Sequence, residues 1–157
     1  MFSLFLRNLL FTILHPGIVA GLIPFLILSK EDLDLIFKPV NLYQYAGIII
    51  CVTGLVILII CIIGFAVKGK GTLSPFDPTK ELVISGLYRY SRNPMYLGVM
   101  LILTGETVFF KSAELLVYGV IVFLLFNVFI KLNEEPRLKK DFGDTYFQYC
   151  KKVRRWI

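Results

Sequence analysis

Charged residues are scarce in this 157-residue chain. Asp, Glu, Lys and Arg make up 18% of the sequence, whereas hydrophobic residues make up 57% and the mean hydropathy is +0.75. A soluble domain needs far fewer apolar residues to build its core. The composition therefore favours a protein whose surface lies largely in an apolar solvent, the lipid bilayer. At this length we expect a single domain over residues 1–157.

Patterns typical of metal sites and of nucleophiles are also missing. His15 is the only histidine, and Cys51, Cys61 and Cys150 form no CxxC or Cys/His spacing. We therefore expect no metal site and interpret the cysteines as packing residues. No serine or cysteine stands out as a nucleophile. We expect no cleavable secretory signal, because the first apolar stretch is too long and lacks a small-residue cleavage site.

Two stretches without charge predict where the first half of the chain crosses the bilayer. No charged residue occurs over residues 8–29 or over residues 39–67. A helix of either length can span a hydrocarbon layer of about 30 Å. We expect Pro16 and Pro24 to kink the first helix, which a packed bundle tolerates. Residues 1–67 are thus predicted to hold two N-terminal spans.

The second half divides into a loop, a hairpin and a tail. Glycine and proline recur through residues 68–94, which predicts an ordered loop. Residues 95–131 are apolar but interrupted near Lys111, so we expect a tight hairpin of two helices of about 17 residues each. A re-entrant hairpin is the alternative. Residues 132–157 are polar and aromatic, and we expect an amphipathic helix that begins near Asp144.

The distribution of basic residues predicts the orientation. With four spans, 14 of the 17 Lys and Arg residues lie on one side of the membrane, and only Lys30, Lys38 and Lys111 lie on the other. The positive-inside rule places the richer side, with both termini, the loop and the tail, in the cytosol. The net charge of +6 then reflects topology and not nucleic-acid binding. The predicted fold is an all-α membrane protein with about four transmembrane helices and a cytosolic C-terminal amphipathic helix.

Two polar clusters flank the predicted hairpin. Residues 86–98 contain two arginines and three tyrosines, and residues 133–137 contain two adjacent glutamates. A tight turn between antiparallel helices brings their outer ends together, so the clusters should meet at the cytosolic boundary. Adjacent carboxylates are costly there unless they hold a cation, and arginine and tyrosine can bind a carboxylate and a sulfonium. Alternatively, the arginines reach lipid phosphates and the glutamates pair with basic neighbours.

The same clusters resemble a family signature. Residues 92–98, Arg-Asn-Pro-Met-Tyr-Leu-Gly, are followed one hairpin later by Glu134 and Glu135. This pair of motifs resembles the Arg-His/Asn-Pro-x-Tyr-x-Gly and Glu-Glu signature of the isoprenylcysteine carboxyl methyltransferase and phospholipid methyltransferase superfamily. Residues 142–149 are similar to the Phe-Gly-x-x-Tyr-x-x-Tyr close of the same group, and residues 69–78 resemble a bacterial or archaeal branch.

The resemblance implies a helical enzyme, here of a prokaryotic cytoplasmic membrane, that binds S-adenosyl-L-methionine from the cytosol. Its acceptor would be lipophilic: a phospholipid amine, an isoprenylcysteine-like carboxylate or another small hydrophobic nucleophile. The cofactor-binding residues that it implies are Arg92, Asn93, Pro94, Tyr96, Gly98, Glu134, Glu135, Tyr146 and Tyr149.

The catalytic residues stay open, with Arg92 and Glu135 as weak candidates. The sulfonium is already activated, so the chemistry depends mainly on positioning and on the exclusion of water. Asn93 stands where the isoprenylcysteine branch usually has histidine, which excludes a titratable base at this position. In this respect the motif is closer to that of the phospholipid N-methyltransferases.

Two other functions are compatible with the pattern. Membrane sterol reductases have a similar C-terminal layout but bind NADPH, and the paired glutamates argue against a pocket for a 2′-phosphate. A non-catalytic scaffold or small transporter should carry polar residues near the middle of the bilayer. Glu106 lies within an apolar helix; we expect it to pair with Lys111, and a functional role is the alternative.

Overall fold

A computed structural model of the chain describes residues 14–68 and 82–157, with the side chains of residues 65–68 excepted. Every regular element within these residues is helical, which confirms the all-α class. The elements, in chain order, are η1 (Ile18–Leu22), α2 (Ile23–Ile27), α3 (Lys30–Asp34), η2 (Leu35–Phe37), α4 (Leu42–Lys68), η3 (Gly86–Arg89), α5 (Pro94–Phe110), α6 (Ala113–Phe129), η4 (Ile130–Glu134) and α7 (Glu135–Lys152).

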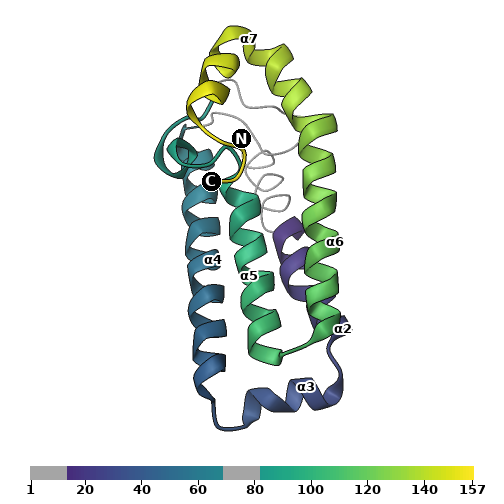
Figure 1. Cartoon of the computed structure of the whole chain (residues 1–157). Helices are drawn as coiled ribbons and strands as arrows, with labels where there is room; N and C mark the ends of the chain where they lie inside the picture. Colours follow the sequence, from purple (N-terminus) through teal and green to yellow (C-terminus); the bar gives the residue numbers. More distant parts are fainter. Residues whose placement is uncertain (1–13, 69–81) are drawn as a thin grey trace, which may run out of the picture.

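The long helices form one bundle. Helices α4, α5 and α6 run along its length, and α2 packs against α6 (Figure 1). The short helix α3 crosses one end of the bundle, whereas α7 bends over the other end, where η3 and the start of α5 also lie. A turn at Lys111 and Ser112 joins α5 to α6, so the predicted tight hairpin is confirmed. Lys111 takes a left-handed conformation with φ 51° in this turn.

Glycines allow the backbones of α4 and α5 to touch. A Cβ atom on Gly54 would lie 2.6 Å from the Gly98 oxygen and 2.8 Å from the Ile102 nitrogen. A Cβ atom on Gly105 would lie 2.6 Å from the Gly47 oxygen. Only glycine permits so close an approach of two backbones. The contact fixes how far α5, and the motif at its start, lies from α4.

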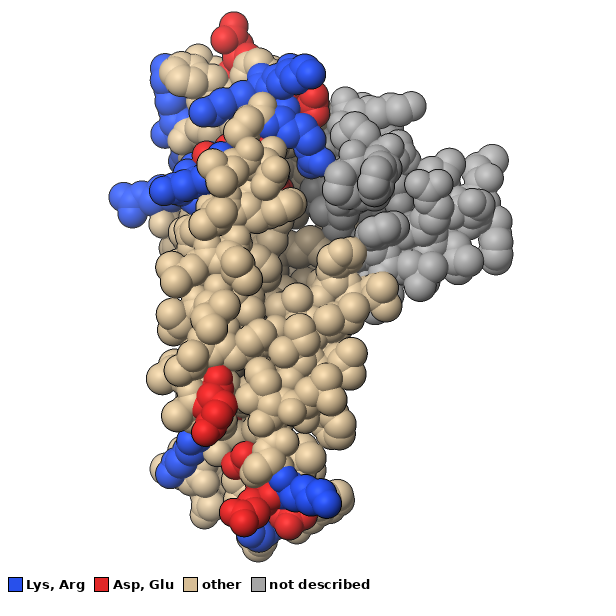
Figure 2. Space-filling model, turned by 90° about the vertical axis from the view of Figure 1, so that its right-hand side faces the viewer, with Lys and Arg blue, Asp and Glu red and all other residues tan. Residues whose placement is uncertain are grey.

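Among the described residues, two helices are long and apolar enough to cross a membrane, judged by length and composition. One lies in α4, over Leu42–Gly64, and the other covers Ala113–Lys152, which α6, η4 and α7 form together. Leu14–Ile27 and Pro94–Phe110 are shorter apolar helices. Figure 2 shows Lys, Arg, Asp and Glu gathered at the two ends of the visible face, with a broad band free of charge between them.

Each of the two π-helical turns precedes a proline. The Ile23 N–H donates to the Ile18 oxygen just before Pro24, and the Glu135 N–H donates to the Ile130 oxygen just before Pro136. A proline cannot donate to the carbonyl four residues earlier, and a local shift to i→i+5 bonding accommodates this loss. The irregularity expected in the first helix therefore occurs as the π turn η1. Residues 8–13 of the predicted first span lie outside the described residues.

The tail is more helical than expected. Gly143 has φ 48° and ψ −122°, so the predicted break is confirmed and a helical segment starts after it, at Asp144. The residues before the break are also helical, because α7 already begins at Glu135 as a continuation of η4. The π turn that precedes Pro136 lets the helix continue where the sequence suggested a polar tail.

Candidate functional site

The two polar clusters meet in the structure, as the predicted hairpin requires. Arg92 Nη1 lies 3.2 Å from Glu135 Oε1, and the Tyr96 hydroxyl donates to Glu134 Oε2 at 3.0 Å. These contacts join the start of α5 to the junction of η4 and α7, which is 38 residues further along the chain for the tyrosine pair. The site therefore lies at the end of the bundle over which α7 bends (Figure 1).

The local sequence explains how α5 begins at this site. Pro94 occupies the first turn of the helix, where its missing N–H costs nothing and its fixed φ favours helix. Asn93 is the N-cap residue, with φ −130° and ψ 52°, and its side chain makes no cap hydrogen bond. Its backbone N–H instead donates to Ser91 Oγ at 3.1 Å. The turn thus directs Arg92 and Tyr96 toward η4 and α7.

Arg92 is the centre of the cluster. Its Nη1 donates to the Tyr146 hydroxyl at 3.3 Å and to Cys150 Sγ at 2.8 Å, in addition to the ion pair with Glu135. Burial disfavours the guanidinium charge and by itself lowers the pKa of Arg92. Electrostatic interactions with the side chains of Cys150, Tyr146 and Glu135 outweigh this effect and raise the pKa above its usual value. Arg92 therefore keeps its charge while only 14% of its side chain is exposed.

Arg155 is a second arginine at Glu135, and the sequence analysis did not identify it. Its Nε donates to Glu135 Oε1 at 2.9 Å and its Nη2 donates to Glu135 Oε2 at 3.0 Å. The Arg155 carbonyl accepts from Asn93 Nδ2 at 3.0 Å and from Ser91 Oγ at 3.3 Å. The Asn93 side chain thus holds the C-terminal segment, which is a contact that the family signature did not suggest.

The partners of Glu134 are fewer. Tyr96 donates to its carboxylate, and the Tyr96 ring lies 4.7 Å from the Phe126 ring on α6. Two buried atoms in this region, Nε of Arg92 and Nε of Arg137, have no hydrogen-bond partner among the described residues. A buried donor without a partner is costly, so its presence indicates a position that a ligand atom can satisfy.

Tyr146 and Tyr149 close one side of the cluster. Tyr146 is 2% exposed and packs with Tyr149 and Val153 in a small apolar core. The Tyr149 hydroxyl donates to the Tyr88 carbonyl at 2.6 Å, which fastens α7 to η3. Burial raises the pKa of the Tyr88 hydroxyl well above its usual value, so this hydroxyl stays neutral.

Gly98 is placed differently from the other signature residues. A Cβ atom on Gly98 would lie 3.0 Å from the Gly54 oxygen and 3.2 Å from the Leu58 nitrogen, both on α4. The close approach that the missing side chain permits is therefore the approach of α4. In this structure Gly98 helps to position α5, whereas Arg92, Tyr96 and the glutamates form the polar cluster.

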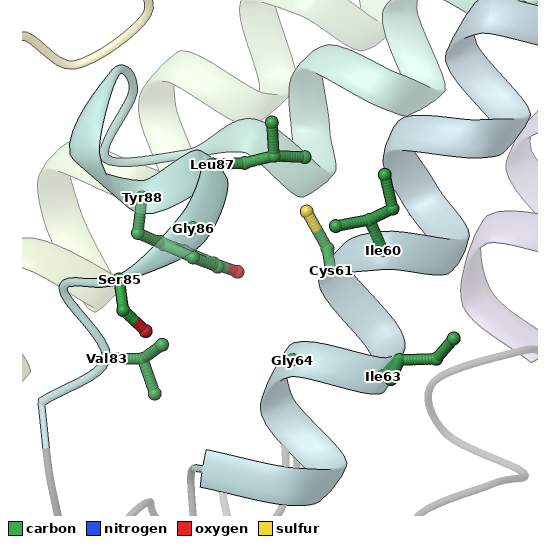
Figure 3. Close-up of a pocket in the computed structure, with 9 residues that line it drawn as sticks. All are labelled: Ile60, Cys61, Ile63, Gly64, Val83, Ser85, Gly86, Leu87 and Tyr88. Atoms are coloured by element: carbon green, nitrogen blue, oxygen red, sulfur yellow. The ribbon is translucent and has the colours of Figure 1, made fainter.

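A cavity of about 270 Å³ adjoins the cluster between the C-terminal half of α4 and residues 83–88 (Figure 3). Tyr88 and Cys61 point toward each other from its two walls. Most of its lining is hydrocarbon, and the lining residues are Ile60, Cys61, Ile63, Gly64, Val83, Ser85, Gly86, Leu87 and Tyr88. Because Tyr149 binds the Tyr88 carbonyl, the cavity shares a wall with the polar site.

The expected pairing of Glu106 with Lys111 was wrong. The Lys111 ammonium lies 3.7 Å from the centre of the Tyr43 ring, and Glu106 Oε2 is buried without a hydrogen-bond partner in the described part of the chain. The turn between α5 and α6 thus brings the lysine onto α4 and not back onto α5. Within residues 14–68 and 82–157, no group of three or more His, Cys, Asp or Glu side chains could hold a metal ion.

Comparison with known proteins gives two matches. The model of the family described as phospholipid methyltransferase matches residues 42–145, which is more than half of the chain and includes both polar clusters. An uncharacterized protein of Haemophilus influenzae is 44% identical over 64 residues, which is 40% of this chain and all of that protein. No solved structure matches the chain.

Proposed function

Because the chain belongs to the phospholipid methyltransferase family, we propose that it transfers a methyl group from S-adenosyl-L-methionine to a lipophilic acceptor. Membership of the family implies a membrane methyltransferase. The methyl donor, the kind of acceptor and the side of the membrane are parts of the proposal. The observation that carries it is the buried cluster in which Arg92 contacts Glu135 and Tyr146, and Tyr96 contacts Glu134.

The residues of the cluster fit the proposed donor. The donor carries a carboxylate, an ammonium, a sulfonium and a ribose diol. The buried Nε atoms of Arg92 and Arg137 lack hydrogen-bond partners among the described residues, and each can donate to a carboxylate. Glu134 accepts a hydrogen bond only from Tyr96 in the described part of the chain, so it retains capacity for an ammonium or a diol. Tyrosine rings favour a neighbouring sulfonium.

The tasks of the protein are binding, orientation and the exclusion of water. When bound, S-adenosyl-L-methionine supplies an activated methyl group, so no protein nucleophile is needed. Arg92 holds the anionic end of the ligand, and Glu134 holds the cationic or hydroxyl groups. Tyr146 and Tyr149 exclude water, since both are buried where α7 packs on the loop before α5. Asn93 and Pro94, two residues of the signature motif, form the start of α5.

The apolar cavity supports a lipophilic acceptor. Ile60 and Ile63 line it, and 47% and 56% of these residues are exposed on the outer face of α4. An apolar chain can therefore reach the cavity from the membrane side. Tyr88 lines the cavity, and its carbonyl accepts a hydrogen bond from Tyr149 of the polar site. The reacting group of the acceptor, a phospholipid amine or a small hydrophobic carboxylate or thiolate, would then lie at the cluster.

We propose four spans for the chain. They are the helix that includes Leu14–Ile27, α4, α5 and α6, with residues 68–94 as the loop and residues 132–157 as the amphipathic tail. Lys30, Lys38 and Lys111 belong to the end of the bundle that α3 crosses, and the other eleven described Lys and Arg residues belong to the other end. The positive-inside rule then assigns the site and both termini to the cytosol of a prokaryotic cell.

Thermal stability with two ligands tests the proposed donor. Purified protein in detergent should gain several degrees in Tm with excess S-adenosylhomocysteine, because a ligand that binds only the folded state stabilises it. NADPH at the same concentration should cause no shift. If NADPH alone raised Tm, the chain would be a reductase and the methyl-transfer proposal would fall.

Incubation with a lipid extract tests the reaction. The protein and a methyl-labelled donor should transfer label to a lipid that partitions into organic solvent, and chromatography then identifies the acceptor. The matched control is the Glu134→Gln variant, which keeps the size of the side chain but removes its charge. Equal labelling of lipid by both proteins would remove Glu134 from the site.

Replacing Gly64 with leucine tests where the acceptor chain binds. Gly64 lines the cavity, and no atom lies within 4 Å of a Cβ built on it, so a leucine side chain starts in open space there. We expect the KM for a long-chain acceptor to rise about tenfold, since lost apolar contacts cost that much in a binding pocket. Binding of S-adenosylhomocysteine should not change.

The control for this variant is Gly17→Leu, which adds the same side chain at another glycine whose Cβ would meet nothing within 4 Å. Gly17 is exposed and does not line the cavity. Its kinetic constants should match those of the natural sequence. An unchanged KM for every chain length in Gly64→Leu would contradict the assignment of the cavity to the acceptor.

A further inference from the structure

We infer that the two adjacent glutamates have different tasks: Glu135 positions Arg92 and is itself held by Arg155, whereas Glu134 contacts the ligand. This inference rests on the proposed function and divides its binding site into a ligand-contacting part and a supporting part. It makes Arg155, a residue of the C-terminal segment outside every signature motif, a positioning residue for the reaction.

Both oxygens of Glu135 are already engaged. Arg155 Nε and Arg92 Nη1 lie 2.9 Å and 3.2 Å from Oε1, and Arg155 Nη2 lies 3.0 Å from Oε2. A carboxylate bound by a two-pronged guanidinium is fixed in orientation. Glu135 therefore has little capacity left for a ligand ammonium. Its position instead fixes where the Arg92 guanidinium lies.

Arg155 is fixed at its backbone as well as at its side chain. Its carbonyl accepts hydrogen bonds from the side chains of Ser91 and Asn93, and the adjacent Arg154 carbonyl accepts from the Arg92 N–H at 3.0 Å. The next residue, Trp156, donates from Nε1 to Asn127 Oδ1 at 3.1 Å on α6. The backbone of Arg155 is therefore held on both sides, so its side chain loses little conformational entropy when the guanidinium binds Glu135.

The surroundings of Glu134 are the opposite. Among the described residues its carboxylate accepts one hydrogen bond, from Tyr96, and the nearby Arg137 has a buried Nε with no partner. The orphaned Nε of Arg92 belongs to the same cluster. Hydrogen-bonding capacity that the protein leaves unused is therefore concentrated on Glu134, Arg137 and Arg92, and not on Glu135. A ligand that carries both positive and negative groups would supply the missing hydrogen-bond partners of these side chains.

The test compares two neighbouring arginines. Arg155→Met should lower the affinity for S-adenosylhomocysteine, measured by calorimetry, about tenfold, which corresponds to about 1.4 kcal/mol. Arg154→Met removes the same charge from an exposed side chain and should bind as the natural sequence does. Arg155→Lys keeps the charge but loses the two-pronged geometry, so its affinity should lie between the two.

A double variant shows whether Arg155 acts through Glu135. If it does, Glu135→Gln combined with Arg155→Met should bind the ligand no more weakly than Glu135→Gln alone. Affinity losses that multiply in the double variant would overturn the inference, as would natural affinity in Arg155→Met. The single tryptophan of the chain, Trp156, reports on the tail. Its emission should be unchanged in Arg155→Met, and a red shift would attribute the loss to tail detachment and overturn the positioning role.

Stability measurements without ligand test this inference independently of the proposed function. If the natural protein bound no S-adenosylhomocysteine, the methyl-transfer proposal would fail. The anchoring of Glu135 would still be tested by Tm, because the losses in Glu135→Gln and Arg155→Met should be less than additive in the double variant when the two side chains are paired. Additive losses would overturn the anchoring in that case too.

Discussion

Replacing Arg92 with methionine should weaken S-adenosylhomocysteine binding about 100-fold, because truncating one member of a buried, hydrogen-bonded charge pair typically costs several kcal/mol. Methyl transfer to lipid should fall below detection. Nη1 of Arg92 contacts Glu135, Tyr146 and Cys150, so its removal takes away the group to which three side chains are directed. Isothermal calorimetry and a labelled-methyl assay measure the two effects.

The control is Arg89→Met. Arg89 lies in η3, three residues before Arg92, and its side chain is exposed. The same loss of charge and length at this position should leave ligand affinity unchanged, which separates a specific contact from a general effect of positive charge near the site. Equal losses in both variants would mean that the ligand senses only the overall field and would remove Arg92 from the proposed site.

Replacing Gly54 with alanine should lower Tm by about 5–10 °C, because overpacking of this kind costs about 1–3 kcal/mol or more. The added methyl group would lie 2.6 Å from the Gly98 oxygen and 2.8 Å from the Ile102 nitrogen. Both are backbone atoms of α5 and cannot turn aside as a flexible side chain would. The two helices must separate, which also displaces the start of α5 and weakens ligand binding.

Gly119→Ala is the matched control. A Cβ atom on Gly119, in α6, would meet nothing within 4 Å. Alanine has a higher helix propensity than glycine, so this change should leave Tm equal or raise it by a small amount. Differential scanning fluorimetry in the same detergent compares the variants. If Gly54→Ala were as stable as Gly119→Ala, the close contact between α4 and α5 would not exist in solution.

The long helices were predictable because the bilayer imposes a strong and simple pattern. A stretch of 29 uncharged residues over 39–67 has few alternatives to a helix, and α4 occupies Leu42–Lys68. The hairpin followed from the charges near Lys111, and the structure places α5 and α6 on either side of that residue. Its closure then brought Arg92 beside Glu135, although they are far apart in the sequence.

The contacts of the C-terminal segment were not predictable. Arg155 is one of several basic residues in the tail, and charge alone does not distinguish the one that turns inward. Its role depends on a carbonyl that binds Asn93 and on a tryptophan that binds Asn127, and neither contact follows from spacing or periodicity. Cys150 was interpreted as a packing residue, but its sulfur lies 2.8 Å from Arg92 Nη1. Such contacts between distant segments need the fold itself.

Glu106 shows why a local charge pair is a weak prediction. Lys111 is close in sequence, but pairing also requires both side chains to point the same way, and the left-handed turn at Lys111 turns the lysine toward Tyr43. The tail helix was predicted only in part, for a related reason: its extension back to Glu135 was not expected. The sequence indicated its break at Gly143, yet continuity through Pro136 depends on the π turn η4, which no residue pattern announces.

The partners in the site are distant along the chain, and this has a consequence for how the molecule folds. Ser91 and Asn93 bind the Arg155 carbonyl across separations of 64 and 62 residues, with both helices of the hairpin in between. Closing so long a loop costs conformational entropy, and the contacts between the two helices offset that cost. We therefore expect the helices to associate before these hydrogen bonds form. An intermediate with its helices already inserted would still lack the finished pocket, and ligand affinity would be among the last properties that the chain acquires.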